Sequence, residues 1–483
     1  MKKNNYLKHF ATIGVGTFLN MLLGVFTTPI ITRMVDPNEY GQFSLFTTYS
    51  GIMVMIMCIG LDQTLVRYYY EHDSVDYKRF LLSKCIFLPV IVCLIVSGIM
   101  IALTSLNIIT LEFSSTVVIE LCIYSFFQLI FRFSQLVVRL EYKSRLYSAL
   151  SIISKIVYVI VAVGLLMYVK GNNLNILIIA IIAAAIVPVI ISIIAQSDFW
   201  NFRKIKKNQE YRLPMKELLK YGYPFIFSMG VMTMFQAVDK ISLQSMRSYA
   251  EVGIYASTNT LVGIFAIVQT SFNALWTPLA VEHYAKDPND VSFYQKGNRI
   301  ITLLMFCMGL TLILCKDVFA LLLGEKYRQA AYILPMLIFN PIMYTVSETT
   351  VGGIVFMKKS GAHIIITLVS CITNIIGNII LVPKLGCQGA AISTGVSYIV
   401  FFTMRTLIAN RYFYIDFKLG SFYFVTFLSV LYALYNSFNS FNIFTVVGYL
   451  VCIVFVMILY WSDVKWCLDY AKKSIDDLRL KQK

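Results

Sequence analysis

Apolar segments of about 20 residues recur along the whole chain of 483 residues. An α-helix of that length crosses the ~30 Å hydrocarbon layer of a bilayer, whereas the strands of a membrane β-barrel would alternate in segments of ~10 residues. Hydrophobic residues make up 58% of the chain and charged residues only 14%, unlike the composition of soluble domains. The sequence therefore predicts an all-α integral membrane protein.

Fourteen segments are predicted to span the membrane. The polar stretches between them are shorter than the ~50 residues of a small folded domain, and no Gly-rich phosphate-binding loop ends in Gly-Lys-Ser/Thr. Both observations argue against an attached nucleotide-hydrolysing domain. The predicted spans are residues 9–32, 41–64, 82–104, 116–139, 146–169, 174–196, 217–238, 252–281, 298–316, 329–356, 361–382, 388–410, 419–436 and 442–462.

The basic residues are distributed unevenly between the two sides of these spans. With the N-terminus in the cytoplasm, Lys and Arg favour the cytoplasmic side by about four to one, as the positive-inside rule requires, and both termini are cytoplasmic. The net charge of +16 is therefore explained by topology and requires no nucleic-acid partner. The scattered Cys and His residues form no recognisable metal site, so we expect no cofactor.

A short sequence element occurs twice at equivalent positions. Residues 39–43 and 251–255 both read Glu-x-Gly-x-aromatic, and each follows the first span of a six-span unit. An even number of spans gives both units the same orientation, and transporters built from such repeats bind their substrate between the halves. We therefore predict two pseudo-symmetric six-helix lobes around a central cavity, plus two extra C-terminal helices. The predicted parts are an N-terminal lobe (1–198), a basic cytoplasmic linker (199–216), a C-terminal lobe (217–410), and the last two spans with a cytoplasmic tail (411–483). The linker is interpreted as a topological anchor, with binding of anionic lipid headgroups as the alternative.

Two neighbouring spans carry polar stripes at helical spacing. A charge near the centre of a membrane helix costs at least ~2.5 kcal/mol, so the charges that occur there usually face a cavity. The stripes predict an aqueous groove in which Arg132 and Lys155 supply positive charge; the alternative is that Glu120 or another carboxylate neutralises Arg132 within the bundle. The stripes are Glu120, Tyr124, Gln128, Arg132, Gln135 and Arg139 on the fourth span, and Ser144, Ser148, Ser151, Lys155 and Tyr158 on the fifth.

Three carboxylates within or near spans are candidates for binding a coupling ion, Na⁺ or H⁺. Glu348 is predicted to be an isolated intramembrane carboxylate, and the alternative is a neutral acid that hydrogen-bonds to Tyr or Thr hydroxyls. Asp62 is a further candidate, although a solvated charge at the membrane interface is the preferred interpretation, and Glu120 is the third. The candidate substrate-binding residues are Arg132, Lys155, Gln128, Gln135, Arg139, Arg33, Asn259 and Asn273.

Several motifs resemble one transporter family. They are Gly-Glu-Lys-Tyr at 324–327, Asn-x-x-x-Asn at 374–378, Leu-Val-Pro-Lys-Leu-Gly-Cys-Gln-Gly-Ala-Ala at 381–391, and Thr-Thr-Pro-Ile-Ile-Thr-Arg at 27–33 leading into the first repeat element. With these motifs the chain resembles the polysaccharide biosynthesis flippases, the Wzx-type transporters of lipid-linked oligosaccharides within the multidrug/oligosaccharidyl-lipid/polysaccharide exporter superfamily. The small residues of these motifs suit close helix packing.

The resemblance implies a function that the residue pattern alone does not give. Such a flippase moves undecaprenyl-diphosphate-linked oligosaccharides from the inner to the outer face of the bacterial cytoplasmic membrane by alternating access. It serves surface polysaccharide assembly, such as capsule or O-antigen, and its candidate partners are membrane lipids and the polymerase and glycosyltransferases of the pathway. The resemblance implies no enzymatic activity, and we expect an ion gradient or the membrane potential to drive transport.

Three other functions compete with this interpretation. A multidrug or other cation antiporter of the same superfamily is disfavoured by the intramembrane cations. A membrane-embedded polymerase or ligase is disfavoured by the short outside loops. A scaffolding membrane protein would have no reason to keep charges within its spans.

Overall fold

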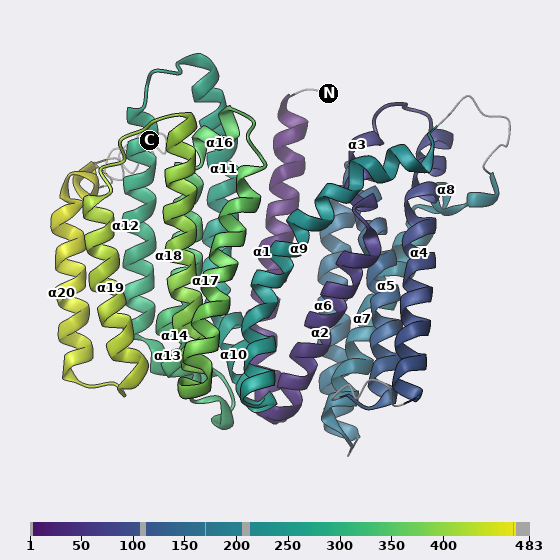
Figure 1. Ribbon diagram of the computed structural model, residues 1–483, viewed down its shortest axis with the longest axis horizontal. Helices are drawn as coiled ribbons and strands as arrows, with labels where there is room; N and C mark the ends of the chain where they lie inside the picture. Colours follow the sequence, from purple (N-terminus) through teal and green to yellow (C-terminus); the bar gives the residue numbers. More distant parts are fainter. Residues whose placement is uncertain (1–2, 107–112, 170, 205–212, 467, 470–483) are drawn as a thin grey trace, which may run out of the picture. The chain divides into compact units, whose positions relative to one another are not determined.

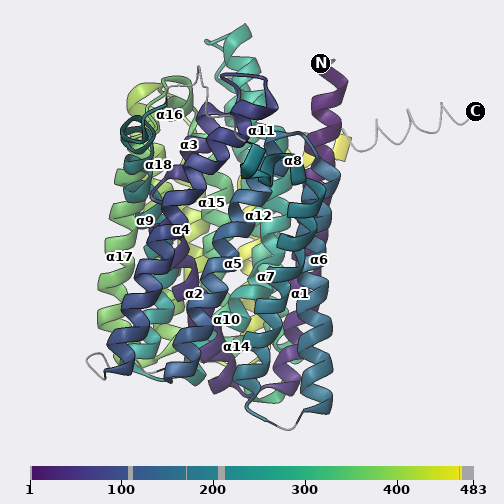
Figure 2. The ribbon, with the colours of Figure 1, turned by 90° about the vertical axis from the view of Figure 1, so that its right-hand side faces the viewer.

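The computed structural model describes residues 3–106, 113–169, 171–204, 213–466 and 468–469, with side chains from residue 14 onward apart from residue 266. Much of the predicted basic linker (205–212) and most of the tail (470–483) lie outside the described residues. All fourteen predicted spans coincide with α-helices (Figures 1 and 2). The predicted all-α architecture is thereby confirmed.

The predicted number of spans is not confirmed. Among the described residues, eleven helices are long and apolar enough to cross a membrane, and the pair α10 and α11, bent by 47°, makes twelve. Helix α20 is apolar but has 17 residues, and α9 is not among the eleven. The helices up to α9 are α1 (Lys3–Met34), α2 (Pro37–Cys58), α3 (Leu61–Tyr68), α4 (Val75–Ser105), α5 (Ser115–Leu140), α6 (Ser144–Tyr168), α7 (Asn173–Ala195), α8 (Ser197–Trp200), η1 (Phe202–Lys204) and α9 (Met215–Met246). Those that follow are α10 (Tyr249–Val262), α11 (Ile264–Lys286), α12 (Ser292–Leu314), α13 (Lys316–Leu322), η2 (Glu325–Tyr327), α14 (Ala330–Leu337), α15 (Phe339–Thr350), α16 (Gly352–Phe356), α17 (Ala362–Leu385), α18 (Cys387–Tyr412), α19 (Gly420–Phe438) and α20 (Ile443–Leu459).

The chain divides into two compact units. The first comprises residues 1–244 and 248–256, and the second comprises residues 245–247 and 257–483. This division differs from the predicted lobe boundary, because most of α9 belongs to the first unit. There the Thr64 hydroxyl donates to the Leu218 carbonyl at 3.1 Å. The pseudo-symmetry of the two lobes and the central cavity between them stay predictions.

The second predicted span is broken near its end. Helix α2 ends at Cys58, and Ile59 and Gly60 follow with φ angles of 50° and 70°. The left-handed region is unfavourable for Ile and easy for Gly, and at Gly60 a Cβ would also lie 2.0 Å from the Gly222 carbonyl oxygen of α9. The break starts a new short helix, α3, and places Asp62 in its first turn.

The two Glu-x-Gly-x-aromatic elements pack directly against each other within the first unit. A Cβ on Gly41 would lie 1.8 Å from the carbonyl oxygen of Tyr249, and a Cβ on Gly253 would lie 2.1 Å from that of Pro37. Each of these carbonyls belongs to the residue four positions before the other glycine. The contact is therefore reciprocal, as twofold-related helices make it, and only glycine allows backbones to approach so closely.

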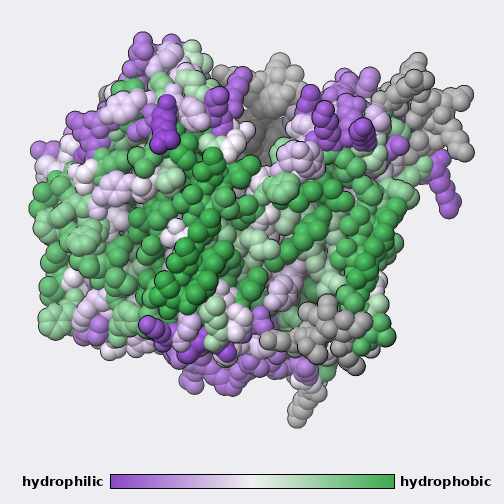
Figure 3. All heavy atoms as spheres, in the orientation of Figure 1, coloured by the Kyte–Doolittle hydropathy of each residue, from purple (hydrophilic) through white to green (hydrophobic). Residues whose placement is uncertain are grey.

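The surface follows the pattern of a membrane protein. Figure 3 shows apolar side chains over the middle of the helices and polar side chains gathered at the helix ends. On α17, for example, Ile365, Ile372, Ile376 and Ile379 are all exposed. Such a face is stable in contact with lipid and unfavourable in water.

Candidate functional site

A polar cavity of about 350 Å³ lies in the first unit beside the stripe predicted on the fourth span. Four of the six stripe residues reach it, together with residues of α3 and α6. The cavity is lined by Asp62, Gln63, Gln128, Phe131, Arg132, Gln135, Leu136, Arg139 and Tyr147.

Helix α5 presents this stripe because its opposite face is fixed in the core. Leu129, Phe133 and Val137 have no exposed surface and belong to the cluster formed with α2, α3 and α4. Since residues three and four apart share a face of a helix, anchoring these three turns the polar residues between them towards the cavity. The stripe thus follows from the period of the sequence.

Arg132 and Asp62 form an ion pair at the wall of the cavity. Nε of Arg132 donates to Oδ2 of Asp62 at 2.9 Å, and Nε2 of Gln63 donates to the same oxygen at 3.0 Å. The Asp62 side chain is only 1% exposed, whereas the Arg132 side chain is 35% exposed. The guanidinium is therefore held on one side by a buried carboxylate and remains open to the cavity on the other.

This pair bears on two interpretations of the sequence. The alternative in which a carboxylate neutralises Arg132 holds together with the cavity, and the carboxylate is that of Asp62. Glu120 is not the partner, because it lies twelve residues away on the same helix, or ~18 Å at 1.5 Å per residue. Asp62 is also no solvated interfacial charge, since the break at residues 59–60 turns α3 and buries its side chain. Its second oxygen, Oδ1, is buried without a hydrogen-bond partner among the described residues.

The two glutamines of the stripe are held by neighbours. Nε2 of Gln135 donates to the Ser151 hydroxyl of α6 at 3.0 Å, and Nε2 of Gln128 donates to the Tyr124 hydroxyl at 2.8 Å. With the amide nitrogens so engaged, the side chains have defined orientations at the cavity wall. The wall thus combines cationic donors with positioned amides.

The structure separates Lys155 from this cavity. Its Nζ lies about 4.0 Å from the position that a Cβ on Gly24 would take, and a Cβ on Gly16 would lie 2.1 Å from Oγ of Ser148. Helix α1 therefore packs along the polar stripe of α6, and Figure 2 shows the two helices side by side. Small residues on α1 permit this approach. The predicted groove is accordingly lined by the α5 stripe, while Ser148 and Lys155 of the α6 stripe lie against α1.

The other predicted site residues do not line this cavity in the described part of the chain. Arg33 is exposed in the last turn of α1. Asn259 is exposed on α10, and Oδ1 of Asn273 on α11 is buried without a hydrogen-bond partner. Oε2 of Glu120 is likewise buried and unpartnered.

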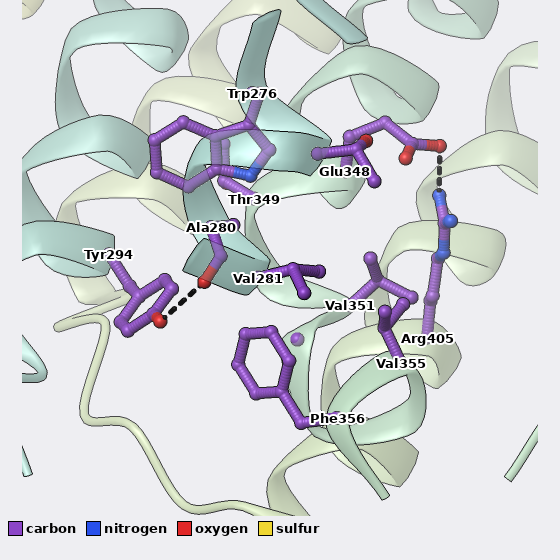
Figure 4. Close-up of a pocket in the computed structure, with 12 residues that line it drawn as sticks. Trp276, Ala280, Val281, Tyr294, Glu348, Thr349, Val351, Val355, Phe356 and Arg405 are labelled. Carbon is purple, nitrogen blue, oxygen red and sulfur yellow. Dashed lines mark hydrogen bonds and ion pairs between the residues drawn. The ribbon is translucent and has the colours of Figure 1, made fainter. Parts of the chain in front are cut away.

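The second unit contains a different ion pair, shown in Figure 4. Nη1 of Arg405 on α18 lies 2.8 Å from Oε1 of Glu348 on α15, and it also donates to the Ser347 hydroxyl at 2.7 Å. The rings of Tyr344 and Phe401 each lie 5.6 Å from the guanidinium carbon. Glu348 is therefore neither an isolated carboxylate nor a neutral acid bound to hydroxyls.

This pair is closed. The side chains of Arg405 and Glu348 are 7% and 12% exposed, and the adjoining pocket holds only about 60 Å³ between apolar walls such as Trp276, Val281 and Phe356 (Figure 4). The sequence analysis does not identify Arg405 as a site residue, although it lies five residues inside the predicted span 388–410. Its position inside a span was the signal that could have identified it.

The fold and the cavity define a class of protein, a multi-pass membrane protein with a cationic, polar cavity among its helices. Residues 6–282 match the family described as "Polysaccharide biosynthesis protein". The match covers more than half of the chain, which therefore belongs to this family. The chain is also 21% identical, over 424 residues, to the capsular polysaccharide biosynthesis protein CapF of Staphylococcus aureus, covering 84% of this chain and 99% of the relative.

Solved structures show the same fold. The lipid II flippase MurJ in an inward closed conformation matches with a TM-score of 0.67 and 15% identity, over 94% of this chain and 99% of that chain. An inward-facing multidrug resistance MATE family transporter of the MOP superfamily matches with a TM-score of 0.61 and 12% identity, over 82% and 94% of the two chains. The resemblance noted in the sequence is thereby confirmed at the level of family and fold.

Proposed function

We propose that the protein is a flippase that moves an undecaprenyl-diphosphate-linked oligosaccharide from the cytoplasmic to the outer face of the bacterial cytoplasmic membrane, with both of its own termini in the cytoplasm. The observation that carries the proposal is the polar cavity of the first unit, which is lined by Arg132, Arg139, Gln128 and Gln135 of α5. The family match and the fold shared with a lipid II flippase support it.

The chemistry of the cargo fits the residues of this wall. A diphosphate needs cationic donors to leave water, and Arg binds phosphate oxygens through a planar fork of N–H groups. The sugars need hydrogen-bonding partners, which the two glutamines provide, while the polyprenyl chain can stay in the lipid. Charge-assisted hydrogen bonds of this kind each contribute about 1.5–3 kcal/mol.

Asp62 has a specific part in this proposal. Because it binds one side of the Arg132 guanidinium, it fixes the orientation of the remaining donors before the cargo arrives. It also lowers the net positive charge of the wall, so the phosphate is held reversibly. A carrier must release its cargo, and a fully uncompensated cation would oppose release.

The same wall argues against an organic cation as cargo. Arg132 and Arg139 contribute two positive charges to the lining, and the single carboxylate of the lining, Asp62, is already engaged by Arg132. A cationic drug would therefore be repelled at this site, and an antiporter for such drugs would need a binding site of different charge.

For the driving force, we propose coupling to a Na⁺ or H⁺ gradient or to the membrane potential. One elementary charge crossing 100 mV is worth ~2.3 kcal/mol. Glu348 can bind an ion only if its carboxylate separates from Arg405, and Asp62 only if its carboxylate separates from Arg132. Glu120 has no ion-pair partner among the described residues. The test measures transport while the Na⁺, H⁺ and electrical gradients are collapsed one at a time, in the wild type and in Glu348→Gln, Asp62→Asn and Glu120→Gln. The variant that loses its dependence on a gradient identifies the ion-binding carboxylate. Transport that continues unchanged without any gradient would show passive equilibration and no coupling.

The experiment that tests the proposed function is flipping of lipid-linked oligosaccharide in proteoliposomes by an Arg132→Ala variant. We expect flipping to fall at least ~10-fold, because a lost charge-assisted contact is worth more than 1.4 kcal/mol, and Arg132→Lys to recover part of it. The matched control is Arg67→Ala on neighbouring α3, whose exposed guanidinium pairs with Glu71 at 3.2 Å outside the cavity. Flipping by Arg132→Ala at the rate of the control, at equal protein content, would refute the assignment.

A further inference from the structure

A second cavity of about 520 Å³ lies between α17 and α18 in the second unit, apart from the residues of the proposed cargo site. The two helices lie side by side in Figure 1. The walls come from Ile365 of α17 and from Met404, Leu407 and Ile408 of α18, while Lys359, Arg411 and Tyr412 stand at one end. The cavity is thus an apolar groove with two cations at its end.

These two cations have no carboxylate partner in the described part of the chain. No ion pair involves Lys359 or Arg411 there, and the nearest aromatic ring to the Lys359 ammonium is that of Tyr412, at 5.9 Å. The sequence explains this lack, because no Asp or Glu occurs between Glu348 and Asp416. The segment that builds the groove therefore cannot neutralise its own positive charge.

The backbone holds Lys359 at this position through a defined turn. After α16, Lys358 adopts a left-handed conformation with φ 54°, and the Lys359 N–H donates to the Ile354 carbonyl at 2.9 Å. This is the turn that commonly ends a helix, with Lys at the position where Gly is usual. Lys359 thus lies just before α17, and Arg411 lies in the last turn of α18, so that both line the same cavity.

The apolar part of the groove is accessible from outside. Ile365 and Leu407, one from each helix, are 55% and 57% exposed. In the predicted topology this end of the two helices lies at the cytoplasmic surface, with the walls continuing into the hydrocarbon layer. Basic residues at the cytoplasmic end of an apolar cleft between membrane helices match the layout of an anionic lipid, whose headgroup lies above its chains.

We propose that this groove binds an anionic phospholipid of the cytoplasmic leaflet, with its phosphate at Lys359 and Arg411 and an acyl chain along Ile365, Leu407 and Ile408. The site is separate from the Arg132 cavity, and the proposal does not depend on which cargo is transported. The lipid would contact both α17 and α18 at their predicted cytoplasmic end.

The test uses the full-length protein in nanodiscs of phosphatidylcholine with phosphatidylglycerol added, including a trace of photoactivatable phosphatidylglycerol. Irradiation followed by peptide mass spectrometry should place the label on the segments around 359–365 and 404–412. In the Lys359→Ala/Arg411→Ala variant we expect labelling there to fall about 30-fold, as two basic residues near an anionic surface predict. The charge-matched control, Lys384→Ala/Lys418→Ala, removes two exposed cations outside the groove and should label like the wild type.

A second variant tests the groove itself and not only its charge. Leu407→Trp keeps both cations and fills the wall, so it should reduce labelling while leaving the protein folded, because the position is exposed to lipid. Equal labelling by a photoactivatable phosphatidylcholine would overturn the proposal, as would undiminished labelling in either groove variant. Displacement of the label by lipid-linked oligosaccharide but not by excess phosphatidylglycerol would also overturn the proposal. It would show that the groove binds the cargo.

Discussion

The two units each bury an arginine–carboxylate pair, and the two pairs differ in how far they are closed. In the first unit Arg132 is 35% exposed beside a polar cavity of about 350 Å³, while its partner Asp62 is 1% exposed. In the second unit Arg405 and Glu348 are 7% and 12% exposed beside a pocket of about 60 Å³. An arginine that is open on one side can exchange partners with a ligand, whereas an arginine enclosed by rings and a carboxylate is part of the core.

The comparison also bears on the internal repeat. Arg132 lies on the fourth predicted span of the first half, and Glu348 lies on the fourth predicted span of the second half. In the predicted repeat these two spans are equivalent, but they contribute opposite charges to their ion pairs: Arg132 pairs with Asp62 on α3, and Glu348 pairs with Arg405 on α18. The two Glu-x-Gly-x-aromatic elements share the reciprocal glycine contact, whereas the polar residues of the fourth predicted span of each half differ in charge.

The largest effect on stability is expected from breaking the closed pair. Glu348→Ala leaves the Arg405 guanidinium buried without its carboxylate, which costs about 3–5 kcal/mol. The free energy of unfolding, measured by chemical denaturation in detergent micelles, should fall by that amount. Replacing both residues by Met should recover most of the loss, because an apolar pair needs no compensation.

A decrease of less than about 1 kcal/mol for Glu348→Ala would contradict the closed character of this pair. It would mean that water or another group reaches Arg405. The two pairs would then be energetically equivalent, and the distinction between them would have to be abandoned.

A smaller loss of stability is expected for the open pair. In Asp62→Asn the amide can still accept a hydrogen bond from Arg132, and water in the cavity solvates the freed guanidinium, so the free energy of unfolding should fall by about 1 kcal/mol. The rate of flipping should fall clearly even though the loss of stability is small, since the orientation of Arg132 is lost and the cargo faces an uncompensated cation. Measuring both quantities for one variant separates the two roles, and a loss of stability equal to that of Glu348→Ala would show that Asp62 is only structural.

Chemical accessibility compares the two arginines without altering either pair. Phenylglyoxal, applied from the aqueous phase, should modify Arg132 and leave Arg405 intact, because Arg132 alone of the two faces the large cavity. Lipid-linked oligosaccharide should protect Arg132. Peptide mass spectrometry reads out both sites, and equal modification of the two arginines would remove the basis of the comparison.

The sequence predicted the helices and the α5 stripe because both follow from periodicity. Gln128, Arg132, Gln135 and Arg139 are spaced by one helical turn, so one buried face fixes the direction of all four. The pairing of Arg132 with Asp62 depends instead on the left-handed break at residues 59–60 and on the contact between α3 and α5. Neither is encoded in local spacing.

The surroundings of Lys155 and Glu348 depend on contacts between helices for the same reason. A polar stripe on α6 faces either a neighbouring helix or a water-filled cavity, and the sequence does not distinguish these two environments. The structure shows that α1 covers Ser148 through Gly16. The Glu348–Arg405 pair required a contact between helices 57 residues apart in sequence, although the place of Arg405 inside a span already suggested a buried partner.

The smallest effect is expected at Lys155, which the sequence assigned to the cargo and the structure places against α1. Its ammonium forms no ion pair among the described residues, and it lies 5.5 Å from the ring centroid of Tyr158. Lys155→Met keeps the length and apolar stem of the side chain and removes a poorly solvated charge, so the free energy of unfolding should stay equal or rise by about 1 kcal/mol. Flipping should remain at the wild-type rate, while Arg132→Ala lowers it at least ~10-fold in the same assay. A loss of flipping in Lys155→Met without loss of stability would show that α1 moves away from α6 during transport and that Lys155 meets the cargo in that other conformation.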